Sequence, residues 1–260
     1  MKNENRLINM HLKAKKHFGQ HFLVNEKIAN DIVDALSFSV NSNIIEIGPG
    51  KGVLTQYLIE KEAHLKVVEI DSDCVKIIQK KFNKIDLIHG DFLKIDLSKV
   101  GFEKYAIIGN FPYNISSQIL FKVLESRDSI FELVGMFQKE VAERICSKPG
   151  SKKYGILSVV IQAYFDCEYL LEVPPDNFQP IPKVHSAVIK IVRNTRKKLD
   201  CNHSDFMKIV KSSFSQRRKK LKNALKNFTN LNHEKLKHLM SKRAEELSVS
   251  DFVKLTNMIS

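Results

Sequence analysis

Five short apolar runs occur within the first 140 residues of the chain, and each has the length of a buried strand. They lie at residues 43–47, 66–70, 86–89, 105–109 and 133–137. Apolar residues at helical spacing precede or separate them, at residues 28–36, 53–58 and 75–82. Strands that alternate with helices predict an α/β fold, in which a parallel sheet carries helices on both faces.

The later part of the sequence shows a change of pattern. Two more short apolar segments, residues 157–164 and 187–192, predict further strands. Beyond Arg193, apolar residues between Phe206 and Leu247 recur instead at the spacing of helical faces. The sequence therefore predicts two domains. Residues 1–193 form the α/β domain with a basic N-terminal segment, and residues 194–260 form a small α-helical domain.

The net charge of the chain indicates what kind of molecule it binds. The chain has 42 Lys and Arg residues against 29 Asp and Glu, which gives a net charge of +13. Such an excess favours a polyanionic partner, and we interpret it as nucleic acid rather than a membrane surface. Eleven basic residues and only two acidic ones lie between Arg196 and Lys226, and a smaller basic group lies between Lys13 and His17. A solvated basic surface is the alternative interpretation.

Cysteine usage and hydropathy indicate the compartment. The four cysteines, Cys74, Cys146, Cys167 and Cys201, are widely separated and form no Cys-x-x-Cys pair. This spacing argues against a structural zinc site and a disulfide framework, and it fits a reducing environment. No apolar run has the length of a signal-peptide core or a membrane span. We expect a soluble cytoplasmic protein with no bound metal and no membrane partner.

A glycine-rich turn predicts a nucleoside site. Gly48-Pro49-Gly50-Lys51-Gly52 lies between a predicted strand and a helix, and Glu69 ends the next strand, where it can accept hydrogen bonds from both ribose hydroxyls. The order Gly-x-Gly-x-Gly after Glu46 differs from the dinucleotide fingerprint and resembles the first motif of S-adenosylmethionine-dependent methyltransferases. Asp91 can then accept from the adenine amine of the cofactor, or it is an ordinary turn or helix cap.

The segment Asn110-Phe111-Pro112-Tyr113 suits chemistry on the amine of a nucleobase. The side-chain oxygen of Asn110 and a backbone carbonyl near Phe111-Pro112 can both accept hydrogen bonds from an NH2 group. Pro112 fixes the local backbone, and Tyr113 offers a ring on which an extruded base can stack. A structural turn at the end of a strand is the alternative for these four residues alone.

Taken together, these motifs resemble the KsgA (RsmA) family of small-subunit ribosomal RNA adenine dimethyltransferases. The segments that carry the resemblance are Phe18–Leu23, Glu46–Gly52, Val68–Asp71, Asn110–Ser117, Tyr154–Val159, Pro174–Val184 and Phe214–Leu221. The resemblance implies a Rossmann-like methyltransferase domain, S-adenosylmethionine as the cofactor, and an RNA substrate.

The resemblance also implies roles for individual residues. The cofactor is expected to contact His21, Leu23, Gly48, Glu69, Asp91 and Asn110, although the family more often has Asn at the position of His21. Catalytic roles fall to Asn110, Pro112, Tyr113 and Phe178. Phe178 is the candidate for the face of the base opposite Tyr113, and a core position is its alternative. RNA phosphates are expected to meet Arg217, Arg218, Lys219, Lys220 and Lys222.

The expected reaction transfers methyl groups to N6 of two adjacent adenines in the 3′-terminal hairpin of 16S rRNA. The products are N6,N6-dimethyladenines, the expected partner is an immature small ribosomal subunit, and we expect the protein to be a monomer. An Erm-type methyltransferase of large-subunit rRNA is one alternative. A noncatalytic RNA-binding assembly factor that keeps the fold is another, against which the intact Gly48, Glu69, Asp91 and Asn110 argue.

Overall fold

The computed structural model describes residues 14–37, 42–228 and 233–259, so Lys13 lies outside the described residues. By their internal contacts, the described residues form two compact units. One unit falls within residues 1–142 and 168–192, and the other within residues 143–167 and 193–260. The second unit therefore includes residues 143–167, a segment for which the sequence predicted membership of the first domain.

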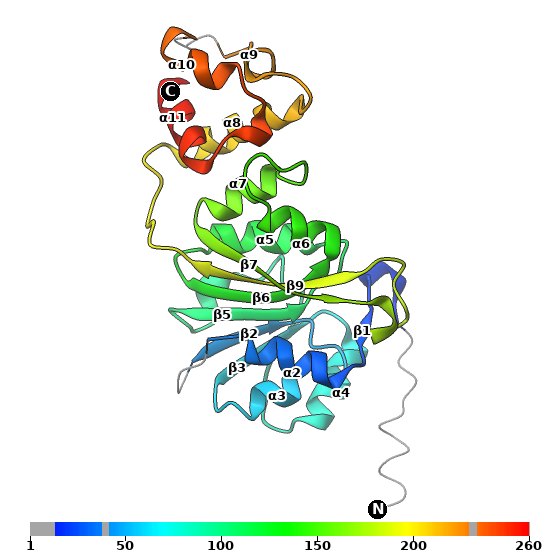
Figure 1. Ribbon diagram of the computed structural model, residues 1–260. Coiled ribbons are helices and arrows are strands. Elements are labelled where there is room, and N and C mark those ends of the chain that lie inside the picture. The colour runs from blue at the N-terminus through cyan, green and yellow to red at the C-terminus, as the bar shows by residue number, and fades with distance from the viewer. Residues whose placement is uncertain (1–13, 38–41, 229–232, 260) are drawn as a thin grey trace, which may run out of the picture. The chain divides into compact units, whose positions relative to one another are not determined.

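A seven-stranded sheet lies at the centre of the first unit. Its strands are β2 (Asn43–Ile47), β3 (His64–Glu69), β4 (Asp86–His89), β5 (Tyr105–Asn110), β6 (Ile130–Gln138), β7 (Phe165–Val173) and β9 (Ser186–Arg193). Their order is β4-β3-β2-β5-β6-β9-β7, and Figure 1 shows the strands from β3 to β7 of that order side by side. The strands from β4 to β6 in that order are parallel, and β9 is antiparallel to β6. The predicted α/β fold is confirmed.

The crossover connections place helices on both faces of the sheet (Figure 1). From β2 the chain passes through α3 (Thr55–Ile59) to β3, and through α4 (Ser72–Lys81) to β4, toward one edge. From β5 it passes through α5 (Ser116–Glu125) to β6, toward the other edge. Because such crossovers are right-handed, α3 and α4 cover one face and α5 the other. The direction reverses between β2 and β5, where a ligand crevice is expected at the carboxyl ends of the strands.

Capping residues in the sequence set the start of two helices in this unit. The side chain of Asn25 accepts a hydrogen bond from the N–H of Ile28 at 3.2 Å and begins α2 (Glu26–Asp34). The carboxylate of Asp71 accepts from the N–H of Asp73 at 3.0 Å and begins α4. These bonds satisfy backbone donors that have no partner inside the helix.

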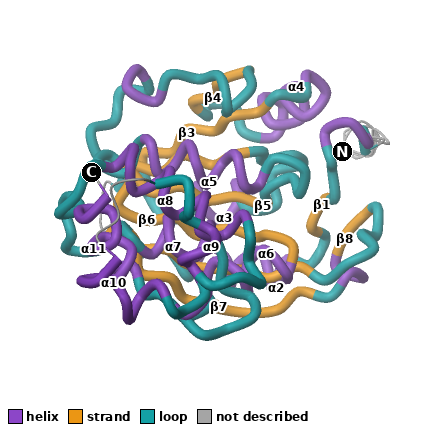
Figure 2. The backbone as a smooth tube through the Cα atoms, turned by 90° about the horizontal axis from the view of Figure 1, so that it is seen from above, coloured by secondary structure: helices purple, strands orange, loops and turns teal. Residues whose placement is uncertain are grey.

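A second, two-stranded sheet joins distant parts of the chain. It pairs β1 (Phe22–Leu23) with β8 (Phe178–Gln179) in antiparallel fashion, and Figure 2 shows the two strands side by side. The pairing continues as the N–H of Val24 donates to the carbonyl of Asn177 at 2.9 Å. The N-terminal segment is thereby held against the segment that leads into β9.

The second unit is helical. Its complete helices are α7 (Ile156–Gln162), α8 (His203–Ser215), α9 (Leu221–Ala224), α10 (His233–Met240) and α11 (Val249–Ile259), and α6 (Lys139–Cys146) crosses from the first unit into it. Aromatic rings form part of its core: Phe214 lies 6.3 Å from Tyr154 and 6.0 Å from Phe252, measured between ring centroids. Within the described ranges, no helix of either unit is long and apolar enough to cross a membrane.

One strand prediction is wrong. Residues 157–164 do not form a strand, because Ile156–Gln162 is the helix α7, and the strand β7 follows it instead. The side chains of Leu157 to Ile161 are all buried. A short, mostly apolar run without a clear period fits a buried strand and a buried helix equally well. The hydroxyl of Ser158, which accepts from the N–H of Gly155 at 2.9 Å, closes the first turn of the helix.

Candidate functional site

A pocket of about 190 Å³ opens in the first unit at the carboxyl ends of β2, β3, β4 and β5. Four segments of the sheet domain line it, together with the N-terminal residues 17–22. The strand ends contribute Ile47, Gly48, Gly50, Val68 to Ile70, Gly90 to Leu93, and Asn110 to Ile115. The pocket thus lies where the crossover direction reverses, as expected for a ligand site in an α/β sheet.

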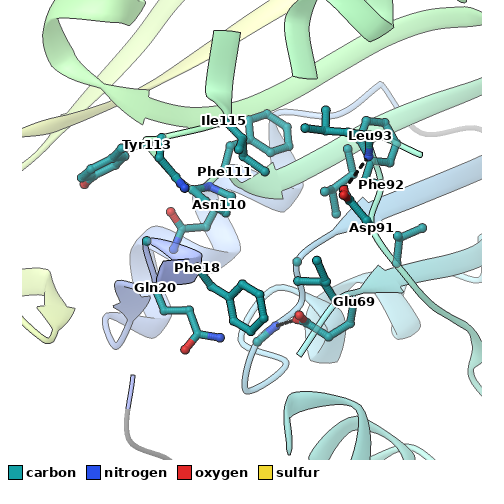
Figure 3. Close-up of a pocket in the computed structure, with 18 of the residues that line it drawn as sticks. Phe18, Gln20, Glu69, Asp91, Phe92, Leu93, Asn110, Phe111, Tyr113 and Ile115 are labelled. Carbon is teal, nitrogen blue, oxygen red and sulfur yellow. Dashed lines mark hydrogen bonds between the residues drawn. The ribbon is translucent and has the colours of Figure 1, made fainter. Parts of the chain in front are cut away.

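Asn110, the last residue of β5, has a fixed amide orientation. Its Nδ2 donates a hydrogen bond to the backbone carbonyl of His21 at 2.8 Å. Because a carbonyl oxygen only accepts, the NH2 end of the amide must face His21, and Oδ1 is left as an acceptor. Figure 3 shows Asn110 and Tyr113 on one side of the pocket, with Glu69 and Asp91 on the other.

Phe111 anchors the turn that follows Asn110. Its ring is buried and lies 5.1 Å from the ring of Phe137. The ring fits against Gly109, where an added Cβ would lie 2.7 Å from a ring carbon of Phe111. The carbonyl of Pro112 accepts from the N–H of Ile115 at 3.2 Å. The carbonyl of Pro112 is therefore already bonded within the turn, so the carbonyl of Phe111 is the better candidate for a second acceptor beside Asn110.

Glu69 ends β3 with both carboxylate oxygens partly in use. One accepts from the N–H of Gly50 at 3.1 Å and the other from the N–H of Asp71 at 2.8 Å. Burial raises the pKa of Glu69. A carboxylate has about four lone-pair sites, so these backbone bonds leave acceptor capacity for hydroxyl donors from the pocket. Gly50 adopts a φ of 55°, and an added Cβ there would lie 3.0 Å from the ring of Phe22.

Asp91 makes a local backbone contact and also lines the pocket. Its Oδ1 accepts from the N–H of Leu93 at 2.9 Å, as in a local turn or cap. Its Oδ2 lies 4.0 Å from the ammonium group of Lys94, a distance too long for a hydrogen bond. Since Asp91 also lines the pocket, this second oxygen is placed to accept a donor there.

The N-terminal segment forms one wall of the pocket. Figure 3 shows the ring of Phe18 pointing into the pocket between Asn110 and Glu69. The ammonium group of Lys15 lies 2.5 Å from Asp71 and 2.7 Å from Asp73, and the amide of Gln20 donates to Asp71 at 2.8 Å. These contacts tie residues 15–20 to the start of α4, so the wall is held in place by a small cluster of charges.

Tyr113 is held at its ring and at its hydroxyl. The ring of His21 stacks on it with centroids 5.5 Å apart and an angle of 23°. The Tyr113 hydroxyl lies 2.5 Å from the hydroxyl of Ser186, which is fully buried at the start of β9. Burial raises the pKa of Tyr113, so the ring is a neutral phenol at physiological pH. A fixed, neutral aromatic ring is a suitable stacking surface for a base.

Two predicted site residues do not line the pocket. Leu23 and Phe178 pair with each other across the β1–β8 sheet and belong to the hydrophobic core. The side chain of Phe178 is 2% exposed, so in this conformation its ring has no open face for a base. The assignment of Phe178 to the opposite face of the base is therefore corrected to a core position. Any contact between Leu23 and a cofactor falls to its backbone.

The basic run in the second unit divides into two classes. Arg217 is engaged within the unit: its side chain pairs with Glu245 at 3.0 Å and donates to the carbonyls of Tyr154, at 3.1 Å, and Lys152. Among the described residues, none pairs with the side chains of the other four members of the run. They are Arg218, Lys219, Lys220 and Lys222, and all are exposed. Of the five residues predicted to bind RNA, Arg217 is therefore the one whose side chain also has structural contacts within the unit.

Sequence reasoning missed the apolar and N-terminal walls of the pocket. Segments that carry the family resemblance include Phe18, Gln20, Ile70 and Ile115, but the sequence predicted no role for these residues or for Phe92. Ile70 and Phe92 directly follow the predicted ligands Glu69 and Asp91. A signal was therefore available, because a residue next to a polar ligand at a strand end often lines the same cleft.

The residues present fit S-adenosylmethionine. Glu69 offers acceptor capacity for ribose hydroxyls, Asp91 offers an oxygen for an adenine amine, and Ile70 and Phe92 offer apolar contact for a flat ring. Gly48 adopts a φ of 66° and meets no atom within 4 Å at its Cβ position, so a side chain there would enter the open pocket. Within the described residues, no group of His, Cys, Asp and Glu could hold a metal ion.

Comparison with known proteins shows similarity to one family over nearly the whole chain. The model of the family described as "Ribosomal RNA adenine dimethylase" matches residues 11–260. A protein named ribosomal RNA small subunit methyltransferase A, from Cytophaga hutchinsonii, is 53% identical over 253 residues, which cover 96% of this chain and 98% of the relative. Its namesake from Flavobacterium johnsoniae is 51% identical over 253 residues, with 95% and 96% covered.

Solved structures agree with these relatives. A dimethyladenosine transferase from Plasmodium falciparum superposes with a TM-score of 0.79 at 27% identity, covering 90% of this chain and 96% of that one. The 23S rRNA methyltransferase ErmE has a TM-score of 0.74 at 22% identity, covering 92% and 99%, which is a likeness of fold alone. The family model matches residues 11–260, and the two relatives are 53% and 51% identical to this chain over at least 95% of its length. The chain therefore belongs to the ribosomal RNA adenine dimethylase family.

Proposed function

We propose that this protein transfers methyl groups from S-adenosylmethionine to N6 of two adjacent adenines in the 3′-terminal hairpin of 16S rRNA, within an immature small ribosomal subunit. The observation that carries the proposal is the amide of Asn110, whose Nδ2 is committed to His21 while Oδ1 is left to accept from an amine beside the cofactor pocket. The small-subunit substrate is supported by the names of the relatives from Cytophaga hutchinsonii and Flavobacterium johnsoniae.

Different groups of residues hold the cofactor and the base. Glu69 is proposed to bind the ribose and Asp91 the adenine amine of the cofactor, with Gly48 and the backbone of residues 21–23 beside them. The cofactor supplies an electrophilic methyl group on a sulfonium. Asn110 and Tyr113 then position the target base, with Pro112 fixing the turn between them.

The proposed chemistry depends on orientation. The lone pair of the adenine amine is delocalised into the ring, which makes it a poor nucleophile. If Oδ1 of Asn110 and the carbonyl of Phe111 accept its two N–H bonds, the nitrogen becomes pyramidal and its lone pair points toward the methyl group. The nitrogen becomes cationic on transfer and loses its proton afterward, so no strong base is needed at Asn110.

Methylation of two isolated substrates distinguishes this function from an Erm-type activity. The purified protein is incubated with labelled S-adenosylmethionine and either immature small subunits or large-subunit rRNA, and mass spectrometry maps the products. We expect dimethyladenine at two adjacent positions near the 3′ end of 16S rRNA. Product on the large-subunit RNA alone would overturn the proposal, and RNA binding without any product would favour a noncatalytic assembly factor.

A further inference from the structure

The loop between β8 and β9 is anchored at one end to Tyr113 and at the other to His21, the residue that stacks on Tyr113. At the first end, Nδ1 of His21 donates to the carbonyl of Pro180 at 2.7 Å, and the His21 ring is the one that stacks on Tyr113. At the other end, Ser186 meets the Tyr113 hydroxyl at 2.5 Å. Only the residues from 181 to 185 lie between the anchors, so this loop must arch beside the proposed position of the target base.

A third contact makes the loop a fixed feature. The backbone carbonyl of His185 accepts from the N–H of Lys139 at 2.9 Å. The carboxylate of Glu172 pairs with both side chains, at 2.6 Å from Lys139 and 2.6 Å from His185. Pro180 and Pro182 flank Ile181, and each ring restricts the backbone at its own φ. The loop therefore presents its side chains in a preorganised arrangement.

This loop displays aliphatic side chains to solvent. Ile181 is 68% exposed and Val184 is 43% exposed, while Pro182 between them is buried. Single exposed aliphatic residues are common on protein surfaces. These two differ because they share one short loop, one end of which contacts Tyr113 through Ser186 while the other end contacts His21, whose ring stacks on Tyr113. The cation of Lys183 lies between them in the sequence and is also exposed.

An adenine can reach Asn110 only if it leaves its stack, and its departure opens a gap between its neighbours. Proteins that unstack bases commonly insert Ile, Leu or Pro side chains between them. An aliphatic wedge stabilises the unstacked state because the side chain replaces the contacts that the base has lost. A nearby lysine adds attraction to the phosphates on either side.

We propose that Ile181 and Val184 form an apolar wedge that enters the RNA base stack beside the target adenine and holds it open while the adenine occupies the site at Asn110 and Tyr113. This inference rests on the proposed function, and it assigns to the β8–β9 loop a contact with RNA bases rather than with a protein. The loop then acts on the substrate, and it has no part in binding the cofactor.

The test compares two hairpin RNAs in methylation assays with the full chain. One RNA has the target adenine in an intact stack, and in the other an abasic site replaces the neighbouring base, so that the adenine is already unstacked. The variant is Ile181→Ser with Val184→Ser. The control is Ile59→Ser, which removes an aliphatic side chain of similar exposure, 45%, from the end of α3.

We expect the double variant to lower kcat/KM on the stacked RNA by about tenfold, since unstacking is the step that the wedge assists. Its rate on the abasic RNA and its affinity for S-adenosylhomocysteine should equal those of the unaltered protein, as should both rates of Ile59→Ser. The fluorescence of 2-aminopurine at the target position, which rises on unstacking, should increase less with the double variant than with the unaltered protein.

Three outcomes would overturn the wedge. They are an unchanged rate on the stacked RNA, an equal loss on both RNAs, and a loss seen only on intact subunits, which would assign the loop to a protein contact. If the unaltered protein methylates neither RNA nor immature small subunits, the proposed function fails instead, and that result is separable because it does not involve the variants.

Discussion

Asn110 uses the two ends of its amide for different purposes. Nδ2 is bound to the carbonyl of His21, which belongs to the N-terminal wall of the pocket, while Oδ1 is proposed to bind the target amine. The first contact sets the direction of the second, because the amide group is planar and rotates as a unit. The position of the N-terminal segment therefore affects the proposed catalytic geometry directly.

Replacement of Asn110 by Ala should slow methyl transfer without unfolding the protein. A lost hydrogen bond to a group that becomes charged in the transition state costs about 1.5–3 kcal/mol, so we expect kcat to fall roughly 10- to 100-fold. The measurement is single-turnover methylation of immature small subunits, with RNA association measured in parallel and expected to persist.

Asn43→Ala provides the control for this variant. The amide of Asn43 likewise donates to a backbone carbonyl, that of Lys104 at 3.0 Å, but it lies outside the pocket. Its turnover should be unchanged. Equal turnover by Asn110→Ala and the unaltered protein would remove Asn110 from the mechanism.

Glu46 is an acid buried in β2 directly before the glycine turn. Burial raises its pKa to about 8, and the hydroxyl of Thr55 donates to its carboxyl group at 2.7 Å. The folded state thus favours the protonated form, whereas the unfolded chain ionises near pH 4.5. The stability that Glu46 contributes is therefore fully present below its unfolded pKa of 4.5, and it is lost as the pH rises through about 8.

We therefore expect the free energy of unfolding to fall between pH 5 and pH 8, by up to about 1.4 kcal/mol per pH unit from this group. Glu46→Gln keeps a neutral side chain of similar shape and should flatten that slope. The measurement is urea denaturation across this pH range. A variant with the same slope as the unaltered protein would show that Glu46 is ionised in the fold.

The N-terminal segment lines the pocket beside the four strand ends. Residues 17–22 form one wall, and this wall is fixed by Lys15 and Gln20 on the acidic start of α4. The hydrogen bond from Lys15 lowers the pKa of Asp73. For Asp71, burial acts in the opposite direction, but the hydrogen bonds from Lys15 and Gln20 prevail and its pKa is also lowered.

Lys15→Ala should loosen this wall and weaken cofactor binding by less than about tenfold, since the pair is partly exposed to solvent. The measurement is the Kd for S-adenosylhomocysteine by calorimetry at low and high salt. Lys76→Ala is the control, because Lys76 also lies near Asp73, at 3.7 Å, but is largely exposed on α4. If both variants bind as the unaltered protein does, the charge cluster has no part in holding the pocket closed.

Across the whole chain, the excess of positive charge is concentrated in the helical unit, where not every cation is available to RNA. Arg217 contacts Glu245 and two backbone carbonyls, so it stabilises the unit itself. Arg218 and Lys220 are exposed and better suited to phosphate contacts.

Arg218→Glu with Lys220→Glu should weaken binding to 16S rRNA and lower the salt dependence of log Kd by about 0.7–0.9 per lost phosphate contact. Cofactor affinity and thermal stability should stay unchanged. Arg217→Ala should instead lower the Tm of the protein. Filter binding across a salt series and thermal denaturation separate these effects, and an unchanged RNA affinity of the double variant would contradict the phosphate assignment.

Local patterns in the chain were sufficient for the fold class, the glycine turn and the main polar residues of the pocket. The run 43–47, the turn at Gly48–Gly52 and the carboxylate of Glu69 each follow from short-range rules about apolar runs, glycine conformation and strand ends. In a parallel sheet the carboxyl ends of strands meet at one edge. The order of the motifs therefore brought Gly48, Glu69, Asp91 and Asn110 together.

Packing between distant segments decided the rest. Residues 157–161 are buried on all sides and mostly apolar, so their helix could be distinguished from a strand only by their surroundings. Phe178 became a core residue because β8 pairs with β1, about 155 residues earlier. Arg217 became a structural residue because Glu245 folds back onto it. Such pairings depend on which surfaces meet in three dimensions, and neither spacing nor residue type at a single position specifies them.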